Sequence, residues 1–412
     1  MITIYSILTQ LAHYLIKVIA LFNPKIKLFV NGRKNVWDKL KQHIQPSTKT
    51  IWVHCASLGE FEQGLPILES LKKHYVSHKI VLTFFSPSGY EVKKNSNAAD
   101  IICYLPLDTK KNARNFIKIV QPDFAIFVKY EFWPNYLSEL HNQNISTYLV
   151  SGIFRKEQLF FKWHGKWMRK SLHTFAHFFI QNQQSEKLLH SINLTNTTIT
   201  GDTRFDRVIE IINRDNSLLF IEQFKNNTTT IVYGSSWPED EVAYLDFINT
   251  SNKAVKHIIA PHNIKKHHIE NLKNSITKPA LLYSQLSDEN LAAYDVFIID
   301  SIGLLTKIYS YADIAFVGGA FKTGLHNTLE PAAFGIPIIT GPKYAKFQEA
   351  SDLVNLGGIM VVNSKKEYEN TLEKLINSEE LRSTTGNINK TYVTQKAGAT
   401  IKIMTQLKKH GT

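Results

Sequence analysis

Cysteine is scarce in this chain of 412 residues: only Cys55 and Cys103 occur, and both lie in apolar, strand-like runs. A structural disulfide is therefore not expected, and a reducing compartment suits the composition. No spacing of cysteine and histidine is typical of a zinc site, and the adjacent His267 and His268 would point apart on a helix. The sequence thus predicts neither a disulfide framework nor a metal site.

Acidic residues are few relative to basic ones, with 35 Asp and Glu against 48 Lys and Arg and a net charge of +13. This balance favours anionic partners such as membrane lipids, nucleic acids or phosphorylated substrates. Basic runs that are interleaved with aromatic residues are scarce outside residues 155–177. Binding to nucleic acid is therefore not predicted.

The first residues lack the marks of a cleaved signal peptide, because no positive charge precedes the apolar run from Ile2 to Phe22 and no small-residue cleavage site follows it. Polar residues at positions 3, 6, 10, 13 and 17 share one helical face, apolar residues fill the other, and lysines and arginines follow. We expect residues 1–30 to form an amphipathic helix and basic flank that lie in the interface of an anionic membrane. A single membrane span and an ordinary core helix are the alternatives. Either membrane arrangement leaves the body of the chain in the cytoplasm.

The length exceeds one ordinary hydrophobic core, so two α/β domains are expected. Apolar, strand-like runs alternate with helical segments at a spacing that predicts right-handed βαβ units and parallel sheets. A polar, asparagine-rich linker of residues 207–229 would join a domain of residues 31–206 to one of residues 230–412. Ligands of open parallel sheets bind beyond the carboxyl ends of the strands, so two facing sheets would form an interdomain cleft.

The stretch of residues 316–331 is the first to indicate a ligand. An apolar run ends in Gly318 and Gly319, and Asn327 and Thr328 precede a helical segment. Glycines let the backbone approach a ligand, the first N–H groups of a helix favour a phosphate, and Glu330 would accept hydrogen bonds from ribose hydroxyls. Neither a Walker loop nor a GxGxxG fingerprint is present, and an ordinary strand-to-helix turn is the alternative.

Charged residues also follow strands in the first half of the chain. Glu60 follows the first strand, and Glu131 and Arg204 follow later ones. A carboxylate at this position would take the proton from an acceptor hydroxyl, while basic groups and a helix N-terminus would stabilise a departing phosphate. The pattern predicts group transfer from a nucleotide donor. Structural roles stay open: Glu60 favouring a helix N-terminus, Glu131 pairing with Lys129, and Arg204 in a surface cluster with neighbouring aspartates.

Taken together, the motifs resemble those of the bacterial 3-deoxy-D-manno-octulosonic acid (Kdo) transferase family, lipid A-specific glycosyltransferases of the GT-B fold (glycosyltransferase family 30). The resemblance covers nearly the whole chain in order. It rests on Trp52–Glu60, Tyr130–Asn135, Gly201–Asp206, Gly234–Ser236, Ala260–His262, Asp300–Gly303, Gly318–Gly319, His326–Pro331 and Gly341–Pro342.

This resemblance implies two Rossmann-like domains, of which the first binds the acceptor and the second, with terminal helices, binds CMP-Kdo. It implies inverting transfer of Kdo from CMP-Kdo to a lipid A precursor (lipid IVA) in lipopolysaccharide inner-core biosynthesis, at the cytoplasmic face of the inner membrane and without a metal or cofactor. Glu60 would be the general base, and Glu131 and Arg204 would stabilise the transition state. The implied CMP contacts are His262, Asn263, Ser301, Ile302, Gly303, Asn327, Thr328, Leu329 and Glu330.

The chain departs from the family pattern at four places, one of which is the loop after Gly319, where Leu325 stands in place of a second glycine and the loop is about one residue shorter. His262 and Leu304 stand where arginine and glutamate are usual, and Arg204 replaces a lysine with its charge kept. The nearest alternative is another GT-B nucleotide-sugar transferase or an epimerase. From a different class, the alternative is a non-catalytic basic protein that binds membranes or nucleic acid.

Overall fold

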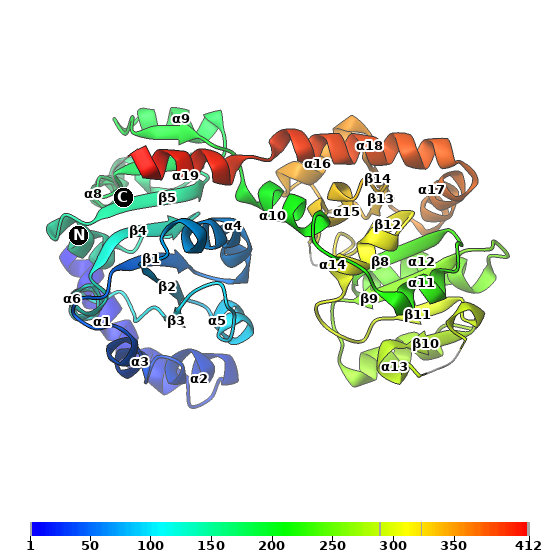
Figure 1. Cartoon of the computed structure of the whole chain (residues 1–412), viewed down its shortest axis with the longest axis horizontal. Coiled ribbons are helices and arrows are strands. Elements are labelled where there is room, and N and C mark those ends of the chain that lie inside the picture. Colours follow the sequence, from blue (N-terminus) through cyan, green and yellow to red (C-terminus); the bar gives the residue numbers. More distant parts are fainter. Residues whose placement is uncertain (1, 288–289, 323, 410–412) are drawn as a thin grey trace. The chain divides into compact units, whose positions relative to one another are not determined.

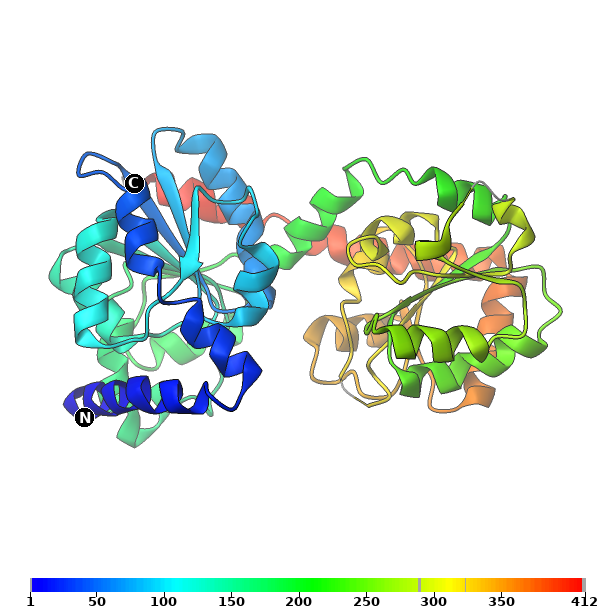
Figure 2. The ribbon, with the colours of Figure 1, turned by 90° about the horizontal axis from the view of Figure 1, so that it is seen from below.

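The computed structural model describes residues 2–287, 290–322 and 324–409, which form two compact units. Unit 1 comprises the chain up to Arg207 together with the residues from Ala397 onward, and unit 2 runs from Val208 to Lys396. Each unit is a parallel sheet with helices packed on it (Figures 1 and 2). The α/β architecture expected from the alternating pattern is therefore confirmed.

Unit 1 contains a seven-stranded parallel sheet in the order β3-β2-β1-β4-β5-β6-β7. Its strands are β1 Thr50–Cys55, β2 Lys79–Phe84, β3 Ile101–Tyr104, β4 Pro122–Val128, β5 Ser146–Gly152, β6 His177–Ile180 and β7 Thr197–Ile199. Its helices are α1 Ile2–Ile19, α2 Pro24–Asn31, α3 Val36–His43, α4 Leu58–His74, α5 Pro87–Lys93, α6 Lys110–Val120, α7 Pro134–Asn142, α8 Lys166–Leu172, α9 Gln183–His190 and α19 Ala399–Lys409. Every residue of β1 is buried, as expected for a strand covered on both faces.

The last helix belongs to unit 1 rather than to the second half of the chain. Alternate side chains of a strand point to opposite faces, so Trp52 and Val53 of β1 enter different hydrophobic clusters. The cluster that contains Val53 also contains Ile403, Met404 and Leu407 of α19. The sequence-based boundary placed residues 230–412 in one domain. The structure differs because the apolar side chains of α19 complete the core of unit 1.

Helix α1 packs on unit 1 through a mixed face that includes Tyr5, Ser6 and Ile16, whereas the polar residues Thr3, Gln10 and Lys17 are exposed. The Tyr5 hydroxyl donates to Asp108 at 2.8 Å, and the Ser6 hydroxyl donates to Asn135 at 3.0 Å. The apolar residues point outward and are 55 to 61% exposed: Ile4, Ile7, Leu8, Leu11, Leu15 and Val18. Figure 2 shows α1 in dark blue along the rim of unit 1. Within the part of the chain that is described, no helix is long and apolar enough to cross a membrane.

Unit 2 contains a second seven-stranded parallel sheet, in the order β10-β11-β9-β8-β12-β13-β14. Its strands are β8 Thr230–Ser236, β9 Lys256–Pro261, β10 Ala280–Leu282, β11 Val296–Ile298, β12 Ile314–Val317, β13 Ile338–Thr340 and β14 Ile359–Val361. Its helices are α11 Leu219–Lys225, α12 Pro238–Thr250, α13 Lys266–Asn274, α14 Leu305–Ile308, α15 Leu329–Ala333, α16 Gln348–Leu356, α17 Lys365–Asn377 and α18 Glu379–Lys396, with α10 Thr203–Ile212 crossing the boundary.

The predicted linker of residues 207–229 is built into unit 2. It contains most of α10 and all of α11, and the α11 side chains Ile221 and Phe224 are fully buried. The Phe224 ring lies 5.3 Å from the ring of Phe297 on β11. Although this passage is polar in composition, it contains the short helix α11, whose apolar residues contribute to the core of unit 2.

The connections leave in opposite directions from the neighbouring strands β1 and β4 in unit 1 and from β8 and β12 in unit 2. At such a switch point the two connections leave toward opposite faces of the sheet, which opens a crevice at the carboxyl ends of the strands. The residues that follow these four strands are therefore the ones that the fold places for ligand binding.

Candidate active site

Glu60 lies at the switch point of unit 1, in the first turn of the helix that follows β1. Ser57 is the N-cap residue of α4, and its hydroxyl donates to Glu60 Oε2. The Ser57 hydroxyl thus holds the Glu60 side chain at the N-terminus of α4, where a general base would have to face its substrate. The side chain is only half-buried, which leaves the carboxylate open to a substrate.

Glu131 follows β4 and is held by nitrogen donors from two sides. Trp133 Nε1 donates to Glu131 Oε2 at 2.8 Å, and His54 Nε2 lies 3.3 Å from the same oxygen. His54 is fully buried on β1, with Nδ1 2.8 Å from the hydroxyl of Thr83, which accepts from Trp52 Nε1 at 2.8 Å. Trp133 Nε1 also lies 3.2 Å from His54 Nε2, so His54, Glu131 and Trp133 form one polar cluster at the end of β1.

Arg204 begins α10 and forms an ion pair with Asp202. The contacts from Arg204 Nε and Nη2 to Asp202 Oδ2 are 2.9 and 2.8 Å. Burial by itself would raise the pKa of Asp202, but the charge and hydrogen bonds of Arg204 and Gln63 outweigh it and lower the pKa below its usual value. Gln63 lies on α4 one turn beyond Glu60, and its amide donates to Asp202 at 3.0 Å. The ion pair is thus tied to the helix that carries Glu60.

The three predicted residues gather at one edge of unit 1. Burial raises the pKa of Tyr130, and the charges of Glu60 and Arg204 both act on its hydroxyl. Burial also raises the pKa of Cys55, and the carboxylates of Glu60 and Glu131 add to that effect. His54 on β1 reaches Glu131, and Gln63 on α4 ties Asp202, and with it Arg204, to the helix that carries Glu60, so hydrogen bonds connect all three side chains to β1 and α4.

In unit 2 the paired glycines after β12 form a tight backbone crossing. Gly319 has φ +94°, and a Cβ at this position would lie 2.2 Å from the carbonyl oxygen of Gly324. The buried carboxylate of Asp240 accepts from Gly319 N at 2.7 Å and from Trp237 N at 2.9 Å. Glycine is therefore required here, and Asp240 joins the loop after β8 to the loop after β12.

His262 lies in a stack of aromatic rings at this edge. Its ring centroid lies 4.6 Å from that of Trp237 and 4.5 Å from that of His326, and part of the side chain stays exposed. Trp237 Nε1 donates to His326 Nε2 at 2.9 Å. Burial and then the neighbouring His262 lower the pKa of His326 to about 4, so its ring is neutral at pH 7. The sequence alone did not indicate a role for Trp237 or His326, although Trp237 follows the motif Gly234–Ser236 and His326 is the first residue of the motif His326–Pro331.

The predicted CMP residues at the start of α15 divide into two kinds. Asn327 Oδ1 accepts from Leu329 N at 3.1 Å, and Asn327 Nδ2 donates to Glu330 at 2.9 Å. Both polar side chains lie toward the surface, whereas those of Thr328 and Leu329 are buried. Asn327 and Glu330 therefore present side-chain groups to a ligand, and Thr328 and Leu329 present only backbone.

The loop of residues 301–303 after β11 meets the same helix. Gly303 has φ +98°, Ile302 is 84% exposed, and Thr306 just beyond the loop donates to Glu330 at 3.1 Å. Asn263, which follows β9, accepts from Lys265 N at 3.1 Å. Since β8, β9, β11 and β12 are neighbours in the sheet, their loops share one edge. In the described part of the chain, no group of three or more His, Cys, Asp or Glu side chains is arranged to hold a metal ion.

The stack makes stability depend on pH. His326 has a folded-state pKa of about 4 against 6.5 for a free histidine, so the unfolded chain binds a proton that the folded chain excludes. Its contribution to stability is present above pH 6.5 and is lost as the pH falls toward 4. As the pH falls over this range, we expect the free energy of unfolding to decrease less steeply in His326→Gln than in the wild type, as measured by urea denaturation. His267→Gln, at an exposed position on α13, serves as the control; equal pH dependence in all three proteins would contradict the assignment.

Comparisons with known proteins agree with the geometry. The family model of 3-deoxy-D-manno-octulosonic-acid transferase (kdotransferase) matches residues 32–207. The 3-deoxy-D-manno-octulosonic acid transferase of Aquifex aeolicus is 30% identical over 325 residues, which cover 77% of this chain and 83% of that protein. The Haemophilus influenzae protein of the same name is 28% identical over 384 residues, which cover 88% of this chain and 87% of that protein.

Among solved structures, the UDP-GlcNAc 2-epimerase of Neisseria meningitidis has a TM-score of 0.62 over 88% of this chain and 100% of its own, at 15% identity. A structural similarity at this identity supports only the two-sheet fold. The activity is inferred from the relatives found by sequence. Since a relative at 30% identity is covered over most of its length and the family model matches the first sheet, the chain belongs to the 3-deoxy-D-manno-octulosonic acid transferase family and is a glycosyltransferase.

Proposed function

We propose that this chain transfers Kdo from CMP-Kdo to a lipid A precursor, lipid IVA, in the biosynthesis of the lipopolysaccharide inner core. The observation that carries the proposal is the set of contacts that ties Glu131 to β1 and Arg204, through Asp202 and Gln63, to the helix of Glu60. An epimerase of the same fold is the nearest alternative, and membership of a transferase family favours transfer.

In the proposed reaction, Glu60 takes the proton of an acceptor hydroxyl while the hydroxyl oxygen attacks the anomeric carbon of Kdo. The bond from that carbon to the CMP phosphate oxygen breaks, and CMP leaves with the electron pair. Attack from the side opposite the leaving group inverts the anomeric centre. The carboxylate of Glu131 stabilises positive charge that develops on the sugar, and Arg204 stabilises negative charge. No metal or cofactor has a part in this scheme.

For the donor, we propose that CMP binds at the carboxyl edge of the second sheet. Asn327 and Glu330 present polar groups suited to the ribose hydroxyls, and the backbone around Gly319 allows close approach of a phosphate. The stack of His262 with Trp237 and His326 offers a flat aromatic surface beside them.

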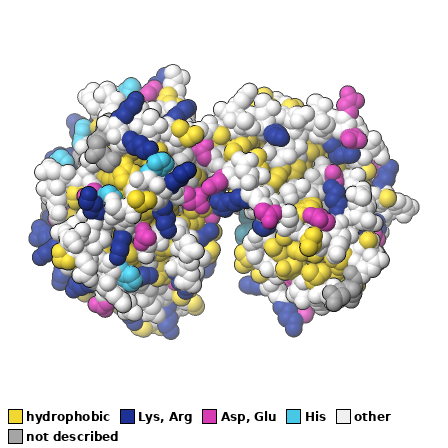
Figure 3. Space-filling view, in the orientation of Figure 1, with side chains coloured by type: hydrophobic (Ala, Val, Ile, Leu, Met, Phe, Trp, Pro, Cys, Tyr) yellow, Lys and Arg dark blue, Asp and Glu magenta, His cyan; other side chains and the backbone are white. Residues whose placement is uncertain are grey.

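For the partner surface, we propose that α1 lies in the interface of the inner membrane, at its cytoplasmic face. The outward apolar row of α1 is the argument, because a water-facing helix normally shows its polar side. Figure 3 shows Lys and Arg side chains spread over the visible face of unit 1, and such charges favour anionic headgroups.

Mass spectrometry of the lipid product tests the proposed function. Purified enzyme, CMP-Kdo and tetraacylated lipid A precursor should yield the precursor with Kdo added, together with one CMP per Kdo transferred. UDP-sugars should give no product. Failure to modify the precursor, or consumption of a UDP-sugar in its place, would contradict the proposal.

A further inference from the structure

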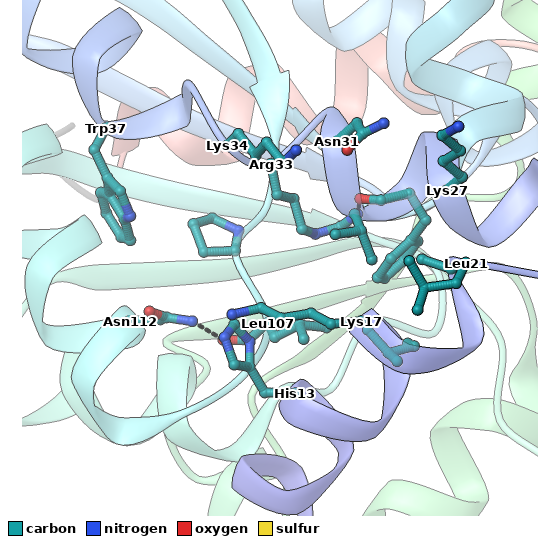
Figure 4. A pocket seen from close by; sticks show the side chains of 15 residues that line it. His13, Lys17, Leu21, Lys27, Asn31, Arg33, Lys34, Trp37, Leu107 and Asn112 are labelled. Carbon is teal, nitrogen blue, oxygen red and sulfur yellow. Dashed lines mark hydrogen bonds between the residues drawn. The ribbon is translucent and has the colours of Figure 1, made fainter.

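A cavity of about 700 Å³ opens in unit 1 between α1, α2 and the loop that follows β3. We call it the α1–α2 cavity. Its walls include the apolar side chains of Ile16, Val30 and Leu107, and Lys17, Lys27 and Lys34 stand around it (Figure 4). This size is typical of sites for small organic ligands. None of the described residues that line it is an aspartate or glutamate, so the cavity is apolar inside and cationic in charge.

Arg33 adds a half-buried positive charge to this cavity. Its guanidinium donates to the carbonyl oxygens of Leu105, Phe29 and Phe85 at 2.9, 2.8 and 2.7 Å, and it lies 3.5 Å from the centroid of the Phe29 ring. All three acceptors are neutral, and within the described chain no carboxylate forms an ion pair with Arg33. An uncompensated cation in a low-dielectric wall favours an anion, and phosphate is the anion that guanidinium and ammonium groups bind best.

The opening of the cavity is continuous with the outward apolar face of α1. Leu21 lines the cavity and is 77% exposed, and Phe22 beside it is 83% exposed. Val18 lies one turn earlier on the exposed row. Leu21 thus belongs both to the exposed apolar surface beside α1 and to the wall of the cavity, so a hydrocarbon chain in contact with that surface can reach into the cavity.

An aromatic wall connects the cavity to the reaction edge. The Phe29 ring lies 5.2 Å from the ring of Phe85, and the Phe85 ring lies 4.5 Å from that of Trp133. Trp133 donates the hydrogen bond that holds Glu131. A chain of aromatic contacts thus leads from the cavity wall to the carboxylate of Glu131, which suits a cavity that holds another part of the same substrate.

We propose that the α1–α2 cavity is a subsite for the lipid acceptor, in which one acyl chain occupies the apolar interior and a phosphate lies among Lys17, Lys27, Lys34 and Arg33. This inference rests on the proposed function, because the acceptor must be a phosphorylated, acylated lipid. The aromatic wall is what favours the acceptor over a bulk phospholipid of the bilayer.

Two variants of the full chain test the subsite by steady-state kinetics in detergent micelles. Val30→Trp fills the interior without a change of charge, and Lys27→Glu/Lys34→Glu reverses exposed charges. We expect each variant to raise the KM for the lipid acceptor by a factor about ten times larger than the factor by which it lowers kcat. The KM for CMP-Kdo should change little. The matched controls are Val76→Trp and Lys187→Glu/Lys402→Glu, at exposed positions of unit 1 outside the cavity. Equal effects in variants and controls, or no effect in the variants, would overturn the inference.

Photo-crosslinking identifies the occupant directly. A lipid acceptor with a photoreactive acyl chain should label Ile16, Val30 or Leu107, and a phosphatidylglycerol probe in the same micelles should label them much less. Labels confined to the outer face of α1, or preferred labelling of the cavity by phosphatidylglycerol, would overturn the proposal. If the wild-type enzyme adds no Kdo to the acceptor, the proposed function fails. If it adds Kdo and the cavity is not labelled, only the subsite fails.

Discussion

Replacing Glu60 by glutamine is expected to slow Kdo transfer by about two to four orders of magnitude, which is the usual contribution of a positioned general base. The amide keeps the size of the side chain and can still accept from Ser57, but it cannot take a proton. Because the change lies in unit 1 and the proposed CMP contacts lie in unit 2, the affinity for CMP should stay within about twofold. The measurements are kcat with saturating substrates and CMP binding by calorimetry.

Glu62→Gln is the matched control for this experiment. Glu62 lies two residues along the same helix, and its carboxylate pairs with Lys93 at 3.2 Å and Arg207 at 3.4 Å on the surface. Loss of such exposed ion pairs costs little, so transfer should stay near the wild-type rate. Near-normal activity of Glu60→Gln, or equal losses in both variants, would disprove the role of Glu60 as the base.

Placing charges on the outer face of α1 is expected to release the protein from anionic vesicles. The variant Leu8→Glu/Leu11→Glu/Leu15→Glu removes three leucines, each of which would contribute about 1 kcal/mol or more when it is buried in the interface. The sum of at least about 3 kcal/mol corresponds to a fall in vesicle partitioning of roughly 100-fold or more. The polar contacts of Tyr5 and Ser6 that hold α1 on unit 1 are untouched. Co-sedimentation with phosphatidylglycerol vesicles measures the effect.

The control variant carries the same change of charge at scattered apolar positions. Val242, Leu356 and Ile401 are 55 to 74% exposed and lie on three different helices. Their replacement by glutamate should reduce vesicle binding only through the altered net charge, an effect that added salt also produces. If the control loses binding as fully as the α1 variant, a specific docking face on α1 is ruled out.

The features that sequence could predict are those encoded by neighbours along the chain. Apolar runs that end in Gly-rich or charged turns placed Glu60 and Gly319 at strand ends, and both lie there. The periodicity of the first residues also predicted the apolar row of α1, which the structure shows exposed. The sheet order, and with it the position of the switch points, was implied only by resemblance, since strand pairing brings together residues far apart in sequence.

The features that sequence missed depend on contacts between distant segments. The stack of Trp237 with His326 joins residues 89 positions apart, and the pairing of His54 with Glu131 joins residues 77 positions apart. Helix α11 is a further example: its polar flanking residues gave no indication that Phe224 is a core residue. No local pattern reports such partners, because a histidine or phenylalanine in isolation fits many environments.

The return of α19 to unit 1 means that the polypeptide passes between the units twice, near residues 207 and 397. A fragment that ends at the first passage would lack Ile403, Met404 and Leu407, whose burial contributes roughly 5 to 9 kcal/mol at about 1.5 to 3 kcal/mol for each side chain. Unit 1 is therefore not encoded by one uninterrupted stretch of the gene. Because the chain connects the units at two points, unit 2 is an insertion within unit 1, and an exchange of unit 2 in evolution would have to replace both connections together.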